Sequence, residues 1–162
     1  MNAIHYDRPT GWAAWALRLA GLNALVNAVG FGAFDVLATW HFAHDHEVWY
    51  ALGKPTYGYG PFYVHGIVTT VPLLLAFLGA CALLAIGGGL LLALRRAGVL
   101  TTLAGIVMCA PFWWGFALPF AWINAATLLV LLSFAWAARK RGRDRSPSHP
   151  EPDLVARSTS DP

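Results

Sequence analysis

The amino-acid sequence predicts an all-α integral membrane protein: four transmembrane helices in an antiparallel bundle, an aromatic and histidine-rich outer loop, and a disordered cytoplasmic tail. Composition is the first observation, because the 162 residues are 57% hydrophobic and only 12% charged, with a mean hydropathy of +0.53. Soluble domains carry about 25% charged residues. The second observation is that the apolar residues are gathered into long runs, and the third is that Lys and Arg cluster between alternate runs.

The first predicted helix covers about residues 13–40. Residues 19–34 carry no charge, although the wider run contains Asn23, Asn27 and Asp35. These polar positions are expected to face other helices rather than lipid. The run is longer than the 7–15 apolar residues of a secretory signal and lacks a small-residue cleavage site. It is therefore interpreted as an uncleaved first span.

The second predicted helix covers about residues 64–94. Residues 66–94 contain no acidic, basic or histidine side chain, and roughly 20 such residues suffice to cross a bilayer. The triple glycine at 87–89, with Gly79 about two turns earlier, predicts close helix approach or a homo-oligomer interface. Pro72 is expected to kink the outer part of this helix.

The third and fourth predicted helices cover about residues 97–114 and 119–138. Residues 97–138 are uncharged throughout, which is about twice the length of one span. Gly115 and Pro119 predict a tight turn between the two helices, because Pro is tolerated in the first turn of a helix. Pro111, like Pro72, is expected to kink its helix and open a cavity toward the outer side. Residues 1–138 thus form one transmembrane domain.

The distribution of Lys and Arg predicts that both termini are cytoplasmic, as in a multi-pass protein of a bacterial inner membrane. Arg95 and Arg96 separate the second and third helices, and five cations follow the fourth, whereas the loop at 43–61 holds only Lys54. Cytoplasmic loops carry an excess of Lys and Arg. The tail at 139–162 begins with these cations and continues rich in Pro and Ser, a composition typical of disorder.

Most aromatic residues of the chain are expected on the outer side. Trp and Tyr favour both membrane interfaces, so a simple aromatic belt would place similar numbers on each side. Two interpretations remain open: a thick belt with loop packing, or an aromatic cavity for an apolar or amphipathic ligand. The candidate ligand-binding residues are Asp35, His41, Tyr63, His65, Trp113, Trp114 and Asn124.

Asp35 is the most informative polar residue. It lies five residues before Trp40 and therefore about 8 Å below the outer boundary of the first helix. A carboxylate at such depth is costly and normally faces the bundle or a water-filled cavity, with a partner. The candidate partners at similar depth are Thr69, Thr70, Asn124 and Thr127, with His41 and His65 just above.

The stretch WHFAHDHEVWY at 40–50 is a candidate metal site. If the first helix continues past Trp40, His41, His44 and Asp45 share one face, because they are three and four residues apart. Together with His65 they meet the ligand count of zinc, but neither H-E-x-x-H nor C-x-x-C is present. The alternatives are hydrated histidines at the interface and a pH sensor based on imidazole titration.

The two cysteines, Cys81 and Cys109, are expected at similar depth. They lie 15 and 13 residues from Arg96 on two antiparallel helices. Two interpretations remain open: a disulfide or metal pair, and free cysteines that behave as small buried hydrophobes within the spans.

Three functional hypotheses follow. The first is a non-enzymatic membrane protein that binds an apolar or amphipathic ligand, or that serves as an accessory subunit of a larger membrane complex. The second is a metal- or haem-dependent membrane enzyme centred on the outer His and Asp cluster. The third is a small oligomeric transporter. No cofactor is favoured, no nucleic acid is expected as a partner, and the lipid bilayer is the predicted surroundings of the chain.

Overall fold

The computed structural model describes residues 11–48, 50–51, 54–55, 57, 60–118 and 120–144 of the chain. Four of its helices are long and apolar enough to cross a membrane, and they pack as a bundle, so the predicted fold class is confirmed. In chain order the elements are α1 (Gly11–Asp45), β1 (Tyr50–Ala51), β2 (Lys54–Pro55), α2 (Pro61–Val64), α3 (Val71–Leu92), α4 (Arg96–Gly115) and α5 (Ala121–Asp144).

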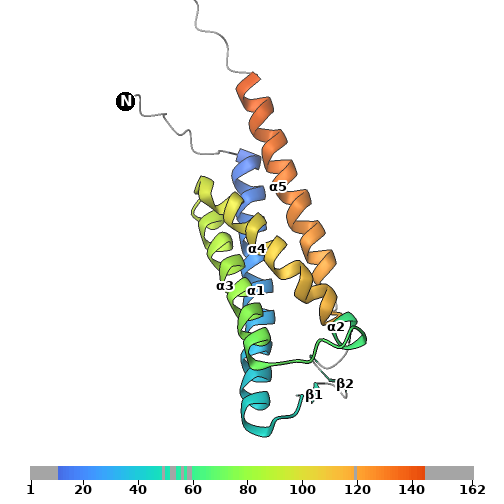
Figure 1. The fold of residues 1–162 in the computed structure, drawn as a ribbon. Helices are drawn as coiled ribbons and strands as arrows, with labels where there is room; N and C mark the ends of the chain where they lie inside the picture. Colours follow the sequence, from blue (N-terminus) through green and yellow to red (C-terminus); the bar gives the residue numbers. More distant parts are fainter. Residues whose placement is uncertain are drawn as a thin grey trace, which may run out of the picture.

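Helices α1 and α3 form the centre of the bundle. Helix α4 packs beside α3 and α5 packs beside α1, while α4 and α5 contact each other little. Figure 1 shows the start of α1, the α3–α4 turn and the end of α5 at one end of the bundle, called here the tail end. The opposite end, called here the loop end, holds the end of α1, the short antiparallel pair β1–β2, α2 and the α4–α5 turn.

Helix α1 is longer than the range 13–40 expected for it. It continues past Trp40 to Asp45, and His46 then adopts a φ of 55°, a left-handed conformation that ends the helix. Its exposed face carries large apolar side chains at spacings of three, four or seven residues. These exposed residues are Trp12, Trp15, Leu19, Leu22, Val26, Val29, Val36 and Trp40.

Helix α3 begins at Val71, so the expected range 64–94 is divided between α2 and α3. The Thr70 side chain accepts a hydrogen bond from the backbone N–H of Leu73 and thereby caps α3. Pro72 consequently lies in the first turn of α3, where its missing N–H costs nothing, and produces no kink there. Pro111 lies inside α4, as expected.

Helix α5 continues through residues 139–144, beyond the expected end at 138. The basic start of the predicted tail is therefore helical. Lys140 Nζ lies 6.0 Å from the ring centroid of Trp136, one turn earlier, a cation–π arrangement. Residues 145–162 of the predicted tail lie outside the described residues.

Glycines bring the central helices into backbone contact. A Cβ added at Gly21 of α1 would lie 2.7 Å from the carbonyl oxygen of Gly88 on α3, and one at Gly87 would lie 2.6 Å from the backbone nitrogen of Thr102 on α4. Gly87 and Gly88 are thus occupied within the chain, whereas Gly79 and Gly89 have nothing within 4 Å. Such small residues let helices approach in lipid, where the hydrophobic effect does not drive them together.

The Gly87→Ala substitution tests this close approach. We expect it to lower the free energy of unfolding by about 1–3 kcal/mol, because the added methyl group forces α3 and α4 apart. The matched control is Gly89→Ala, on the exposed face of the same helix, which should leave stability unchanged or raise it, since Ala favours helix by about 1 kcal/mol. Thermal unfolding of the detergent-solubilised variants measures both. Equal effects of the two substitutions would contradict the proposed packing.

Candidate functional site

A buried carboxyl group without a hydrogen-bond partner marks the candidate site. Asp35 is 0% exposed, and neither of its carboxyl oxygens has a partner. The hydroxyl of Thr39, one turn further along α1, is likewise buried without a partner. Because residues four apart lie on one helix face, these two groups are neighbours. An unsatisfied buried polar group costs about 1–3 kcal/mol, so this arrangement needs an explanation.

The thiols of Cys81 and Cys109 lie beside Asp35. Cys81 on α3 and Cys109 on α4 are 3% and 0% exposed. They lie at the same level of two closely packed helices, because a Cβ added at Gly105, one turn before Cys109, would lie 2.8 Å from the Cα of Leu84, one turn after Cys81. The carboxyl of Asp35 acts electrostatically on Cys81. A Cβ added at Gly32, one turn before Asp35, would lie 3.8 Å from the Cβ of Cys81. The junction of α1, α3 and α4 therefore combines one acid and two thiols.

Trp113 is a further buried donor without a partner, one turn beyond Cys109 on α4. It is 2% exposed, and its indole N–H is buried without an acceptor. It lies one turn after Cys109 on the same face of α4, and its ring meets that of Trp122 on α5 with 6.1 Å between centroids. The buried polar cluster, defined by Asp35, Thr39, Cys81, Cys109 and Trp113, thus draws on three helices.

An aromatic cap covers this cluster from the loop end. It consists of Tyr57, Phe62, Phe77, Phe112 and Phe116. The ring of Tyr57 lies 4.7 Å from that of Phe116 and 6.2 Å from that of Phe77, and Phe77 stands one turn before Cys81 on α3. These rings pack against one another, as in the loop-packing interpretation of the two that the sequence left open.

Tyr57 links the loop to Asp35. Its backbone carbonyl accepts a hydrogen bond of 2.5 Å from the hydroxyl of Thr69, which fixes the segment before α2 to the segment before α3. Burial raises the pKa of the Tyr57 phenol, and the nearby Asp35 and Cys81 raise it further. The phenol is therefore neutral at physiological pH and lies within electrostatic reach of the carboxyl.

Phe62 packs the aromatic cap against the end of α4. A Cβ added at Gly115 would lie 2.3 Å from the Phe62 ring, and one at Gly60 would lie 2.6 Å from the carbonyl oxygen of Gly115. The φ of Gly60 is 114°, a conformation that L side chains rarely adopt. The glycines at 60 and 115 are therefore needed for α2 to lie across the end of α4.

Asn124, a predicted site residue, has a structural partner. Its amide donates a hydrogen bond to the side-chain oxygen of Asn27, and the amide of Asn27 donates to Asn23. This polar stripe joins α5 to α1 about two turns below Asp35. Such hydrogen bonds stabilise helix association in membranes by about 0.6–2 kcal/mol. Thr127, a candidate partner of Asp35, donates to the Ile123 carbonyl of its own helix.

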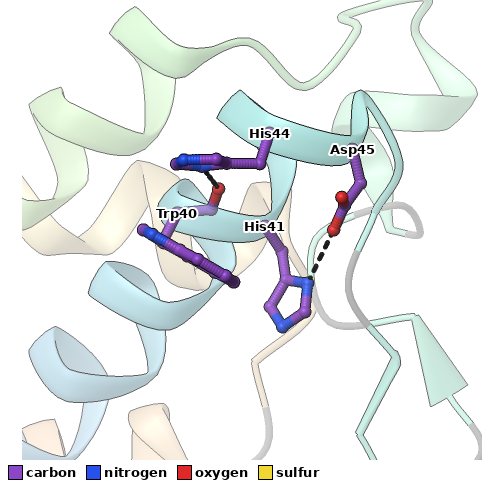
Figure 2. A network of polar contacts seen from close by, with 4 residues as sticks. All are labelled: Trp40, His41, His44 and Asp45. Atoms are coloured by element: carbon purple, nitrogen blue, oxygen red, sulfur yellow. Dashed lines mark hydrogen bonds and ion pairs between the residues drawn. The ribbon is translucent and has the colours of Figure 1, made fainter.

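The histidine-rich end of α1 forms a local network, drawn in Figure 2. His41 Nδ1 lies 3.0 Å from the carboxylate of Asp45, and His44 Nδ1 donates to the Trp40 carbonyl at 2.9 Å. The ring of His44 also packs against that of Trp40, with centroids 4.6 Å apart. His41 and Asp45 share a face, as the sequence predicted for a helix continuing past Trp40, and they complete the last turn of α1.

His65, Trp114 and Tyr63 lie on the exposed side of the cap. The imidazole of His65 stacks on Trp114 with 6.0 Å between centroids, and Trp114 and Tyr63 are 49% and 68% exposed. Neither His41 nor His65 hydrogen-bonds to Asp35, because both carboxyl oxygens lack partners. The structure therefore brings only Asp35 and Trp113, of the predicted ligand-binding residues, to the buried polar cluster.

The predicted metal set of His41, His44, Asp45 and His65 gains no geometric support. Within the described parts of the chain, no three His, Cys, Asp or Glu side chains come together in a way that could hold a metal ion. A catalytic zinc requires three protein ligands. The set stays a prediction from sequence and carries no proposal below.

Sequence reasoning did not assign Thr39 or Tyr57 to the site. The four-residue spacing of Asp35 and Thr39 could have indicated that Thr39 lies beside Asp35 on one face of the helix. Tyr57 lies among many aromatic residues of the loop, and no local pattern distinguishes the ring that becomes buried. For Cys81 and Cys109 a similar depth was predicted, and the close approach of Gly105 to Leu84, one turn from each cysteine, agrees with it.

Comparison of this chain with protein-family models, with curated proteins and with solved structures finds no match. The class of the protein consequently rests on its own features. Four candidate spans, apolar side chains on the outward faces of the bundle, and backbone contact between helices define a small multi-span membrane protein.

The Asp35→Val substitution tests whether Asp35 has a structural partner. We expect the free energy of unfolding to rise by about 1–3 kcal/mol, because an unsatisfied carboxyl is replaced by an apolar group. The control is Asp45→Val, which removes an exposed pair with His41 and should change stability little. Thermal unfolding in one detergent measures both. A clear loss of stability in Asp35→Val would show that the carboxyl already has a stabilising contact.

Proposed function

We propose that this small multi-span membrane protein binds an amphipathic molecule, with an apolar body and a hydrogen-bonding head group, at the loop end of the bundle. The supporting observation is the concentration of unpartnered buried polar atoms beneath the aromatic cap. Among the described residues, four of the five such side-chain atoms belong to Asp35, Thr39 and Trp113, and the fifth belongs to Thr102. Native proteins leave few buried polar groups unsatisfied, so a cluster of them supports a missing partner.

The chemistry of these atoms restricts the head group. The indole N–H of Trp113 is a donor only, the Thr39 hydroxyl donates and accepts, and a carboxyl accepts or, when protonated, donates. A hydroxyl or carbonyl head group complements this set. The aromatic cap would face the apolar body, because rings offer large apolar contact areas and favour edge-to-face contacts with other rings.

We also propose that the tail end is cytoplasmic. Arg95, Arg96 and Lys140 lie at that end, and Asp45 and Glu47 lie at the loop end. An excess of Lys and Arg on the cytoplasmic side supports this orientation. The site would then be located in the outer half of the membrane, with both termini inside the cell.

Cysteine labelling in intact cells tests the orientation. A membrane-impermeant maleimide should label Glu47→Cys from outside the cell, and Lys140→Cys only after permeabilisation. The native cysteines are buried and provide the unlabelled background. The reverse pattern would refute the proposed orientation.

Photolabelling tests the ligand site. The probe is a long-chain alcohol bearing a diazirine, and the control is the matching alkane without the hydroxyl group. In detergent-solubilised or nanodisc-embedded protein we expect the alcohol to label peptides that contain Asp35 or Trp113, in competition with unlabelled alcohol.

The Asp35→Val variant should lower this labelling at least fivefold, because the head group loses its polar partner, while Asp45→Val should leave it unchanged. The alkane should label lipid-facing positions such as Val26 and Leu100, which are 65% and 74% exposed. If the two probes give the same peptides in the same proportions, the protein has no such site.

A further inference from the structure

We infer that Cys81 and Cys109 form a redox-active dithiol, which a lipid-soluble quinone bound at the site oxidises to a disulfide between α3 and α4. This inference rests on the proposed function and names the class of its ligand. It assigns a chemical role to the two buried thiols, which ligand binding alone does not use.

The placement of the two thiols is the first argument. Cys81 and Cys109 come from neighbouring antiparallel helices, and both are buried at the same level, one turn from the close approach of Gly105 on α4 to Leu84 on α3. A disulfide requires the two sulfur atoms to close to about 2.05 Å. Pro111, two residues beyond Cys109, offers no N–H to the preceding turn of α4. The helix is therefore more adaptable beside one of the two thiols.

The burial of the two thiols favours a lipid-soluble oxidant. The two cysteines are 3% and 0% exposed and lie within candidate spans, so a water-soluble oxidant does not reach them easily. A quinone dissolves in the bilayer and accepts two electrons together with two protons. Its two carbonyl oxygens are acceptors that complement the unpartnered Trp113 N–H and Thr39 O–H, and its flat ring suits the neighbouring aromatic cap.

The reaction balances as a two-electron, two-proton exchange. The two S–H bonds break, one S–S bond forms, and the quinone becomes a hydroquinone with two new O–H bonds. The thiolate is the reactive form of a cysteine. Asp35, which acts electrostatically on Cys81, is the buried base that takes the proton of that thiol and returns it to the quinone oxygen. Asp35 is thus inferred to be a proton-transferring residue of the site.

Thiol counting after exposure to a quinone tests this inference. The full-length protein is reduced, freed of reductant, and incubated without oxygen with decylubiquinone in nanodiscs. It is then denatured and alkylated with a maleimide of known mass. Because the chain has only two cysteines, intact mass reports their state directly. We expect both thiols to be lost together within a monomer, with one quinol formed per protein.

Variants separate this chemistry from unspecific oxidation. Cys81→Ser and Cys109→Ser should each abolish quinol formation, and Asp35→Asn should slow it at least tenfold and change the pH profile of the rate. Asp45→Asn is the matched control and should keep the native rate. Thermal unfolding verifies that each variant is folded, and Cys81→Ala replaces Cys81→Ser if the latter is not. Quinol formation by a single-cysteine variant at the native rate would overturn the inference.

The alcohol photoprobe distinguishes the two possible failures. If decylubiquinone competes with the probe but both thiols survive, the site is real and the dithiol chemistry is wrong. If the probe labels the site and decylubiquinone neither competes nor oxidises, the ligand is not a quinone. If the probe labels no specific site and the thiols survive, both the proposed function and this inference are refuted.

Discussion

The backbone contacts of α3 with α1 and α4 are the constraint on which the rest of the structure depends. Lipid tails are as apolar as the helix surfaces, so association in a membrane relies on close packing and interhelical hydrogen bonds. Here Gly21 meets Gly88, and Gly87 meets the backbone of Thr102. These contacts fix the position of α3 along both partners. As a result, Cys81 of α3 packs against Gly32 of α1 and lies at the same level as Cys109 of α4, nearer to the loop end than the glycine contacts. The aromatic cap covers the loop end of the bundle.

The buried polar residues of α1 differ in whether they have hydrogen-bond partners. Asn27 is satisfied by Asn23 and Asn124, and together they join α5 to a bundle in which α4 contacts α5 little. Asp35, two turns further, has no partner. The hydrogen bonds of Asn27 stabilise the fold, whereas the unpartnered carboxyl group of Asp35 lowers the free energy of unfolding. Such local violations of good packing are concentrated at functional sites.

The number of candidate spans could be predicted from the sequence, because it depends on the lengths of the apolar runs. The start of α3 could not, since residues 66–70 carry no charge and extend the uncharged run, although Thr70 caps α3 and Pro72 lies in its first turn. The aromatic cap was predicted as a group, but which rings become buried depends on tertiary contacts of Tyr57 and Phe62. For the histidine-rich end of α1 the shared face of His41 and Asp45 could be predicted from helical spacing, whereas metal binding there stays a prediction.

The length of α1 has a consequence for the membrane itself. Exposed Trp12 and Trp40 stand near its two ends, and 28 residues of helix between them span about 42 Å. This distance equals the thickness of a bilayer with its headgroups, about 40–45 Å. Because Trp favours both interfaces, two rings at this spacing would resist sliding of the helix along the membrane normal. A thinner bilayer would require α1 to tilt, and the depth of the buried carboxyl group would then depend on the lipid composition of the membrane.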